Sequence, residues 1–144
     1  RTLVMKPKFV VCDEPTSMLD VSIRISIMDL MLNLAKELEV SYLYITHDLA
    51  VARYMCDRIA VMFNGKIVEI AETEDLLQNP IHPYTKRLIS SIPIPDPSFK
   101  RETYKIDFDE LDKIITKNPH EKMVDIGGGH FIATHDTKEF FIDS

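Results

Sequence analysis

The stretch Phe9–Glu14 (FVVCDE) decides the fold of this chain. Its first four residues are apolar, and its last two, Asp13 and Glu14, are carboxylates. A short, wholly apolar run is typical of a strand in a parallel sheet that is covered on both faces. Open α/β sheets bind ligands at the carboxyl ends of their strands. The sequence therefore places the acidic pair where a ligand would bind.

Two neighbouring carboxylates at such an edge suit phosphoryl transfer. One can bind a cation, while the other orients or deprotonates the attacking water. Taken alone, the pair is equally compatible with a solvated strand end followed by a helix cap.

The residues after this strand alternate between helical and extended patterns, which predicts an α/β layer with parallel strands. A proline-rich stretch, 92–97, is expected to be extended and stiff, so we expect a boundary there. The predicted elements are helices at about 22–39, 49–56, 72–78, 84–91 and 109–116, a strand at 41–46, and hairpins of 59–63 with 66–70 and 123–126 with 131–134.

Composition narrows the function classes. The chain has 144 residues and a net charge of −6, which argues against a general nucleic-acid binder, since those present a basic surface. Two cysteines make no disulfide framework and suit a reducing cytoplasm. No apolar run approaches the roughly 20 residues of a membrane span, and we see no signal peptide.

His47 follows the second predicted strand. If the two strands are neighbours in a parallel sheet, His47 lies on the same edge as Glu14. An imidazole there can donate a hydrogen bond to a terminal phosphate or hold the attacking water. Taken alone, His47 is as readily a structural polar residue, and Asp48 is best explained as a helix cap.

Ser17–Asp20 (SMLD) lies between the two strand ends and, taken alone, predicts a turn with a helix N-cap at Asp20 or Ser22. Together with Phe9–Glu14 and His47, it resembles three motifs of ABC-transporter ATPases. These are the Walker B strand, the D-loop and the switch histidine of the H-loop. The resemblance covers roughly residues 1–95 and implies the C-terminal half of a RecA-like P-loop domain with parallel strands and a terminal hairpin.

The resemblance implies a function for each matching residue. Asp13 would bind the Mg²⁺ of Mg-ATP, and Glu14 would polarise the hydrolytic water. His47 would contact the γ-phosphate. Ser17 and Asp20 would lie at the interface of two ATPase domains that enclose ATP. The implied cofactors are ATP and Mg²⁺.

A second resemblance narrows the subfamily. Asn79–Thr85 (NPIHPYT) resembles the C-terminal signature of oligopeptide, dipeptide and nickel importer ATPases, and the ending 128–133 (GGHFIA) is similar too. We interpret this signature as structural, with His82 not catalytic. The implied organisation is an ATPase portion, 1–78, and a C-terminal extension, 79–144. No cysteine follows Cys56, so the iron–sulfur cluster of some relatives is not expected.

The two resemblances imply an ATP-hydrolysing subunit that energises import of oligopeptides or dipeptides. Its partners would be transmembrane permease subunits, a second ATPase subunit, identical or different, and indirectly an extracytoplasmic solute-binding protein. It would lie peripherally on the cytoplasmic face of the membrane. Cargo is selected by other subunits in this family.

The chain contains neither the Gly-rich Walker A loop with its lysine nor the signature motif, so we expect part of a longer protein that does not hydrolyse ATP alone. Three alternatives remain open. They are a non-catalytic interaction module, an importer ATPase for nickel or another solute, and a metallohydrolase built on Asp13, His47 and Asp48.

Overall fold

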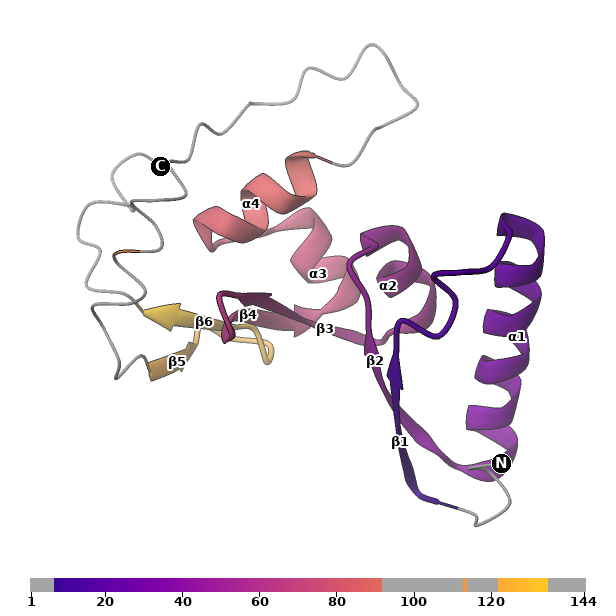
Figure 1. The fold of residues 1–144 in the computed structure, drawn as a ribbon. Coiled ribbons are helices and arrows are strands. Elements are labelled where there is room, and N and C mark those ends of the chain that lie inside the picture. The colour runs from indigo at the N-terminus through magenta and orange to yellow at the C-terminus, as the bar shows by residue number, and fades with distance from the viewer. Residues whose placement is uncertain (1–6, 92–112, 114–121, 135–144) are drawn as a thin grey trace. The chain divides into compact units, whose positions relative to one another are not determined.

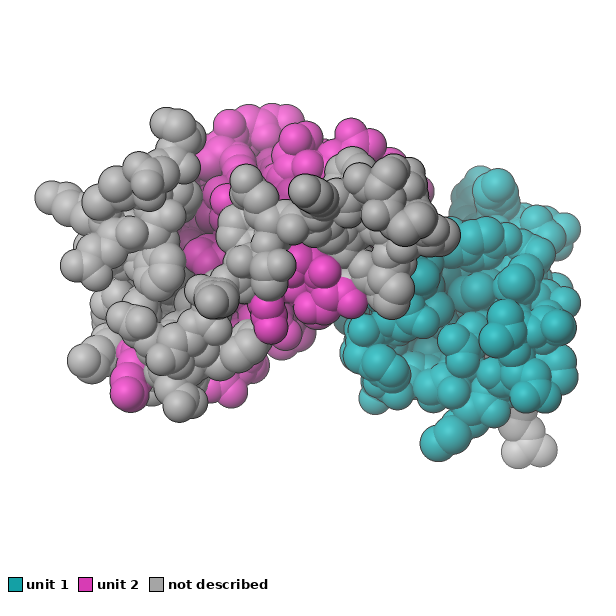
Figure 2. Space-filling view, turned by 90° about the horizontal axis from the view of Figure 1, so that it is seen from above, with its two compact units in different colours: residues 1–56 teal, residues 57–144 magenta. Residues whose placement is uncertain are grey.

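The structure is a computed structural model that describes residues 7–91, 113 and 122–134. The chain divides into two compact units, residues 1–56 and 57–144 (Figure 2). This division follows contacts along the chain, and the boundary expected between residues 78 and 79 stays a prediction. The expected stiff segment at 92–97 lies outside the described residues, as does nearly all of the expected helix at 109–116.

The first unit alternates strands and helices, as the sequence predicts (Figure 1). Its strands pair in parallel and in register, from Phe9 opposite Ser41 to Asp13 opposite Ile45. A parallel pair needs a crossover connection, and the helix between the strands provides it. The elements are β1 (Phe9–Asp13), α1 (Val21–Leu38), β2 (Ser41–Ile45) and α2 (Leu49–Met55).

Helix α1 begins and ends within a residue of the predicted bounds. Asp20 is its N-cap residue, and Glu39, with φ of 52°, is a left-handed C-cap. The N–H of Val40 donates to the carbonyl of Ala35, and the buried Val40 then leads directly into β2. The left-handed cap thus returns the chain beside the start of β1.

Burial in the first unit differs from the prediction of strands covered on both faces. One face of the β1–β2 sheet is open among the described residues. The apolar face of α1 is also only partly used, with Met28 its one buried residue. The open sheet face carries Phe9 (57% exposed), Val11 (56%), Leu43 (49%) and Ile45 (46%).

The second unit is a mixed sheet and helix layer whose described strands run in the order β3-β4-β6-β5, all antiparallel. The β3–β4 hairpin turns at Asn64 (φ 49°) and Gly65 (φ 79°), as predicted for an Asn-Gly turn. The elements are β3 (Arg58–Phe63), β4 (Lys66–Glu72), α3 (Thr73–Gln78), α4 (Pro83–Ser90), β5 (Lys122–Asp125) and β6 (Phe131–Thr134).

An irregularity in β4 brings a carboxylate into the core. Val61 pairs with Glu69 and Met62 with Ile67, so Val68 is an extra residue on β4. A bulge of this kind re-aims the following side chain. Val68 and Glu69 are consecutive, yet both are completely buried.

Glu69 is stabilised by partners from two parts of the chain, residues 81–82 and His130. The N–H of Ile81 donates to Oε1 (2.8 Å) and that of His82 to Oε2 (3.0 Å). His130 Nε2 is hydrogen-bonded to Oε1 (2.7 Å), while its Nδ1 is hydrogen-bonded to Asp75 Oδ2 (2.9 Å). The His130 ring thus bridges two carboxyl groups, one buried and one exposed. We call Glu69, Asp75 and His130 the carboxylate–histidine triad, in which Glu69 and His130 are buried and Asp75 is exposed.

Helix α4 starts inside the Asn79–Thr85 stretch. His82 is buried and is the N-cap residue, its Nδ1 accepting from the N–H of Tyr84 (3.1 Å), and Pro83 occupies the first turn. The Tyr84 ring packs on Phe63 with centroids 4.5 Å apart. In this structure the stretch packs the helix onto the sheet; that His82 is not catalytic stays a prediction.

Among the helices that the structure describes, none combines the length and the apolar character needed to cross a bilayer.

The carboxylate–histidine triad predicts a large loss of stability for His130→Ala. The change leaves the Glu69 carboxyl group buried without its imidazole partner, which should cost about 3 kcal/mol of the free energy of unfolding. Urea unfolding measures it. Lys122→Ala, at an exposed position on β5, is the control and should change little. Equal losses for the two variants would contradict this account.

The triad also predicts a pH effect at Asp75. Hydrogen bonds from Asn79 Nδ2 (3.0 Å) and then from His130 lower the pKa of Asp75. A lowered folded-state pKa stabilises the fold above the unfolded pKa, and this contribution is lost as pH falls through the folded value. Asn79→Ala should raise the pKa of Asp75, observable in a carboxyl NMR titration. An unchanged titration would show that Asn79 is not the main cause.

Candidate functional site

The carboxyl ends of β1 and β2 lie side by side. Asp13, the last residue of β1, is opposite Ile45, the last residue of β2, and the N–H of Glu14 donates to the Ile45 carbonyl (2.9 Å). The side chains that follow both strands therefore start from neighbouring points. This is the arrangement on which the sequence prediction for Glu14 and His47 depended.

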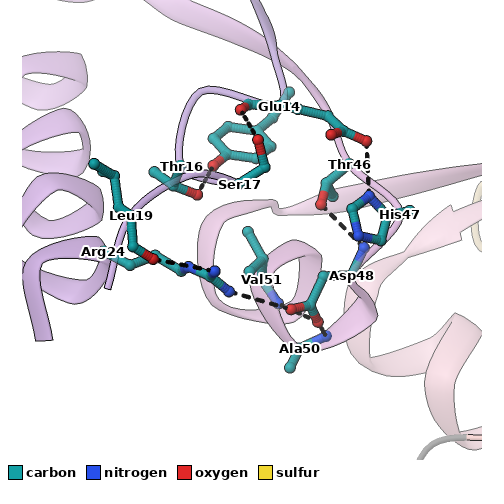
Figure 3. A network of polar contacts seen from close by, with 11 residues as sticks. Glu14, Thr16, Ser17, Leu19, Arg24, Thr46, His47, Asp48, Ala50 and Val51 are labelled. Atoms are coloured by element: carbon teal, nitrogen blue, oxygen red, sulfur yellow. Dashed lines mark hydrogen bonds and ion pairs between the residues drawn. The ribbon is translucent and has the colours of Figure 1, made fainter. Parts of the chain in front are cut away.

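Glu14 and His47 are in direct contact. His47 Nδ1 lies 2.7 Å from Glu14 Oε1 (Figure 3). Because an ionised carboxylate only accepts, Nδ1 carries a proton and donates it. The contact is open to solvent, since the side chains are 76% exposed for His47 and 44% for Glu14.

The backbone of Glu14 has a left-handed conformation, with φ of 43°. Such values are uncommon for residues other than glycine and cost free energy. Here the conformation turns the chain sharply out of β1 while the Glu14 side chain faces His47 (Figure 3). Strained backbone conformations cluster at functional sites, so the conformation of Glu14 fits a functional role for this residue.

The segment after Glu14 forms a compact turn, residues 14–20. The Glu14 carbonyl accepts from the N–H (3.2 Å) and the hydroxyl (2.9 Å) of Ser17. Thr16 is buried, and its hydroxyl is 2.9 Å from that of Tyr44 on β2. The turn is thereby fastened to the second strand.

Asp13 and Asp20 are both exposed. Asp20 occupies the N-cap position of α1, one of the two predicted caps, yet its side chain makes no capping hydrogen bond. Its carboxylate is not used in holding the helix. Asp13 lies beside Glu14 at the strand end, where it leaves the sheet edge acidic.

Asp48 caps the helix that follows His47, as the sequence predicts. Its Oδ1 accepts from the N–H groups of Ala50 (2.9 Å) and Val51 (3.4 Å). Its own N–H donates to the Thr46 hydroxyl (3.0 Å). His47 is therefore flanked by two residues whose positions are set by local hydrogen bonds.

These residues line a small pocket of about 50 Å³. About 10–15 Å³ of such space is enough to hold one water molecule, whereas small-molecule sites usually exceed about 300 Å³. The pocket therefore suits water and is too small to enclose a nucleotide. Its lining residues, all from the first unit, are Glu14, Thr16, Ser17, Arg24, Tyr44, Thr46, His47, Asp48 and Val51.

The side chains at this edge suit a Mg²⁺ site that is completed by substrate phosphates better than a metal site made of protein ligands alone. Among the described residues, no three His, Cys, Asp or Glu side chains are grouped to hold an ion, so the metallohydrolase alternative gains no support. Mg²⁺ in phosphoryl-transfer sites needs only one or two carboxylates, with substrate phosphates and water completing its shell. Asp13 can serve in that way.

Cys12 precedes the acidic pair but is not a candidate nucleophile. Burial raises the pKa of its thiol, which therefore stays protonated near neutral pH.

The structure thus brings Glu14, Ser17 and His47 to one pocket. Asp13, just before the 14–20 turn, and Asp20, its last residue, do not line this pocket. Sequence reasoning missed Arg24, Thr16 and Tyr44. The hydroxyl pair joins residues 28 positions apart. No local pattern marks such a pair.

Comparison with known proteins agrees with the motifs. Residues 68–120 match the family described as "Oligopeptide/dipeptide transporter, C-terminal region". The chain is 49% identical over 138 residues to the oligopeptide transport ATP-binding protein AmiF of Streptococcus pneumoniae, covering 92% of this chain and 42% of that protein. It is 46% identical over 141 residues to the dipeptide transport ATP-binding protein DppF of Lactococcus lactis, covering 96% and 44%.

Among solved structures, the chain is similar to cbiO1 of Clostridium perfringens, described as part of the ABC transporter complex cbiONQ. The TM-score is 0.50 at 32% identity, over 54% of this chain and 31% of that one. The α/β fold expected from the resemblance, the C-terminal half of an ABC ATPase domain, is confirmed. The chain spans about two fifths of the length of the transport proteins it matches.

Proposed function

We propose that this relative of oligopeptide and dipeptide transport ATP-binding proteins provides the water-activating side of an ATP-hydrolysis site. The observation that carries the proposal is the 2.7 Å contact between Glu14 and His47 at the joint end of two parallel strands. It places a carboxylate and an imidazole at one small pocket that has room for water.

Glu14 acts on the attacking water. With one carboxylate oxygen bonded to His47, the other is left to orient that water and to accept its proton. His47 donates through Nδ1 to Glu14, which leaves Nε2 for the reacting group. Nε2 accepts from water when the ring is neutral and donates to a phosphate oxygen when it is charged.

Asp13 is the residue that would hold Mg²⁺, and its exposed carboxylate at the strand end fits that task. Mg-ATP, when bound, supplies the phosphoryl group and a cation that neutralises its charge. The sequence contains no glycine-rich loop with Lys-Ser/Thr, the usual cradle of the β- and γ-phosphates. This chain therefore contributes the water and metal side of the site.

Ser17 and Asp20 are proposed to contact a second ATPase subunit. Both are exposed in the 14–20 turn, and Asp20 does not use its carboxylate for capping. The whole protein would work with transmembrane permease subunits, and indirectly with an extracytoplasmic solute-binding protein, on the cytoplasmic face of the membrane. The names of the relatives favour peptides as cargo over nickel.

The first test is Glu14→Gln in the full-length protein. The amide keeps the shape and a hydrogen bond to His47 but cannot accept the proton of water. We expect turnover to fall by about 100-fold or more, with nucleotide affinity unchanged. Single-turnover hydrolysis and equilibrium ATP binding measure the two quantities. Wild-type turnover would remove Glu14 from the mechanism.

The second candidate function is a non-catalytic interaction module, which the absent phosphate loop favours. For this 144-residue chain alone, we expect no binding of Mg-ATP at micromolar concentration and no hydrolysis. Calorimetric titration of the chain is the measurement. Micromolar binding would show that these residues hold the phosphates without a glycine-rich loop.

A further inference from the structure

Arg24, which no sequence motif marks, connects the two halves of the site. It lies in the first turns of α1, and its side chain is 26% exposed. Nη2 donates to the carbonyl of Leu19 (3.4 Å), and Nη1 lies 3.7 Å from Asp48 Oδ2 (Figure 3). One guanidinium thus spans from the 14–20 turn to the residue after His47.

The Asp48 end of this link is rigid. Oδ1 of Asp48 is already bonded to the first N–H groups of α2, which leaves Oδ2 for Arg24. The Asp48 N–H is held by Thr46. A displacement of the Asp48 carboxylate therefore moves the His47 backbone with it.

The Leu19 end lies in the 14–20 turn, where Leu19 itself is half-buried. Its N–H donates to the Thr16 carbonyl (3.2 Å), and its neighbour Met18 is 97% exposed. Leu19 also lies between Ser17 and Asp20, the two residues proposed to meet a second subunit. A second subunit that contacts this turn would act directly on the Leu19 carbonyl, which accepts the hydrogen bond from Arg24.

A simple surface ion pair does not account for the position of Arg24. Its Nε is buried and has no hydrogen-bond partner among the described residues. Leaving a buried donor unpaired is unfavourable, which reduces any gain in stability from this ion pair. It also lines the same pocket as Glu14 and His47. Arginine suits a two-ended link because its guanidinium is planar and presents donors in a fixed fork.

We propose that Arg24 is a positioning residue that couples the 14–20 turn to the His47–Asp48 segment. The inference rests on the proposed function and adds a way for subunit contact at the turn to set the position of His47. Arg24 itself contacts neither the nucleotide nor the attacking water in this scheme. Its loss should therefore slow the chemical step without weakening ATP binding.

The test uses the full-length protein with five variants: Arg24→Gln, Arg24→Lys, Asp48→Asn, Arg24→Gln combined with Asp48→Asn, and Lys36→Gln. Asparagine is as good an N-cap as aspartate, so Asp48→Asn removes the ion pair and keeps the helix start. Lys36→Gln removes a positive charge from the last turn of the same helix and is the matched control.

We expect Arg24→Gln to lower kcat about tenfold, because a small misplacement of a catalytic group is costly, with KM for ATP unchanged. Arg24→Lys should restore only part of the rate, since it keeps the charge and loses the fork. Asp48→Asn should resemble Arg24→Gln, and the double variant should be no slower than either, because both break one link. Lys36→Gln should behave as wild type.

Three results would overturn the proposal: wild-type kcat for Arg24→Gln, a raised KM at unchanged kcat, or losses that multiply in the double variant. If Arg24→Gln does not fold, as judged by its unfolding midpoint, Arg24→Lys against Asp48→Asn decides instead. Glu14→Gln run alongside separates the two ideas. Fast turnover of that variant refutes the proposed function, whereas slow turnover with a normal Arg24→Gln refutes the coupling alone.

Discussion

The first unit depends on the in-register parallel pairing of β1 with β2. Strand side chains alternate between faces, so a slip by one residue would send the residues beyond each strand in the opposite direction. With Asp13 opposite Ile45, Glu14 and His47 leave the sheet beside each other and meet at 2.7 Å. Deep burial holds neither side chain in place. Their positions, and with them every chemical role considered for the pocket, therefore depend on that register.

The second unit depends on a different feature, a buried carboxyl group. The bulge at Val68 turns Glu69 inward, and backbone donors from the start of α4 together with His130 compensate for its loss of water. The Asn79–Thr85 stretch, diagnostic in sequence, thus has a physical task here: it presents two N–H groups to a carboxylate. The family match over residues 68–120 includes Glu69 but ends before His130.

Local chemistry made much of the fold predictable. The apolar run before Asp13, the Asn64-Gly65 turn and the proline at the start of α4 each act within a few residues, and the structure follows them. Long-range pairs escaped prediction, because His130 and Glu69 are 61 residues apart and a bulge has no signature in single residues. The sequence also did not predict the open face of β1 and β2. An apolar run indicates that its residues favour burial, but it does not show which element covers them.

The left-handed backbone at Glu14 has a consequence for how this site responds to selection. Glycine would adopt φ of 43° without strain, so the residue that suits the chain conformation best is one that has no carboxylate. Stability and activity therefore pull in opposite directions at this position. Variant libraries screened only for thermal stability should lose glutamate at this position. Retained glutamate therefore indicates that the chain is still under selection for activity.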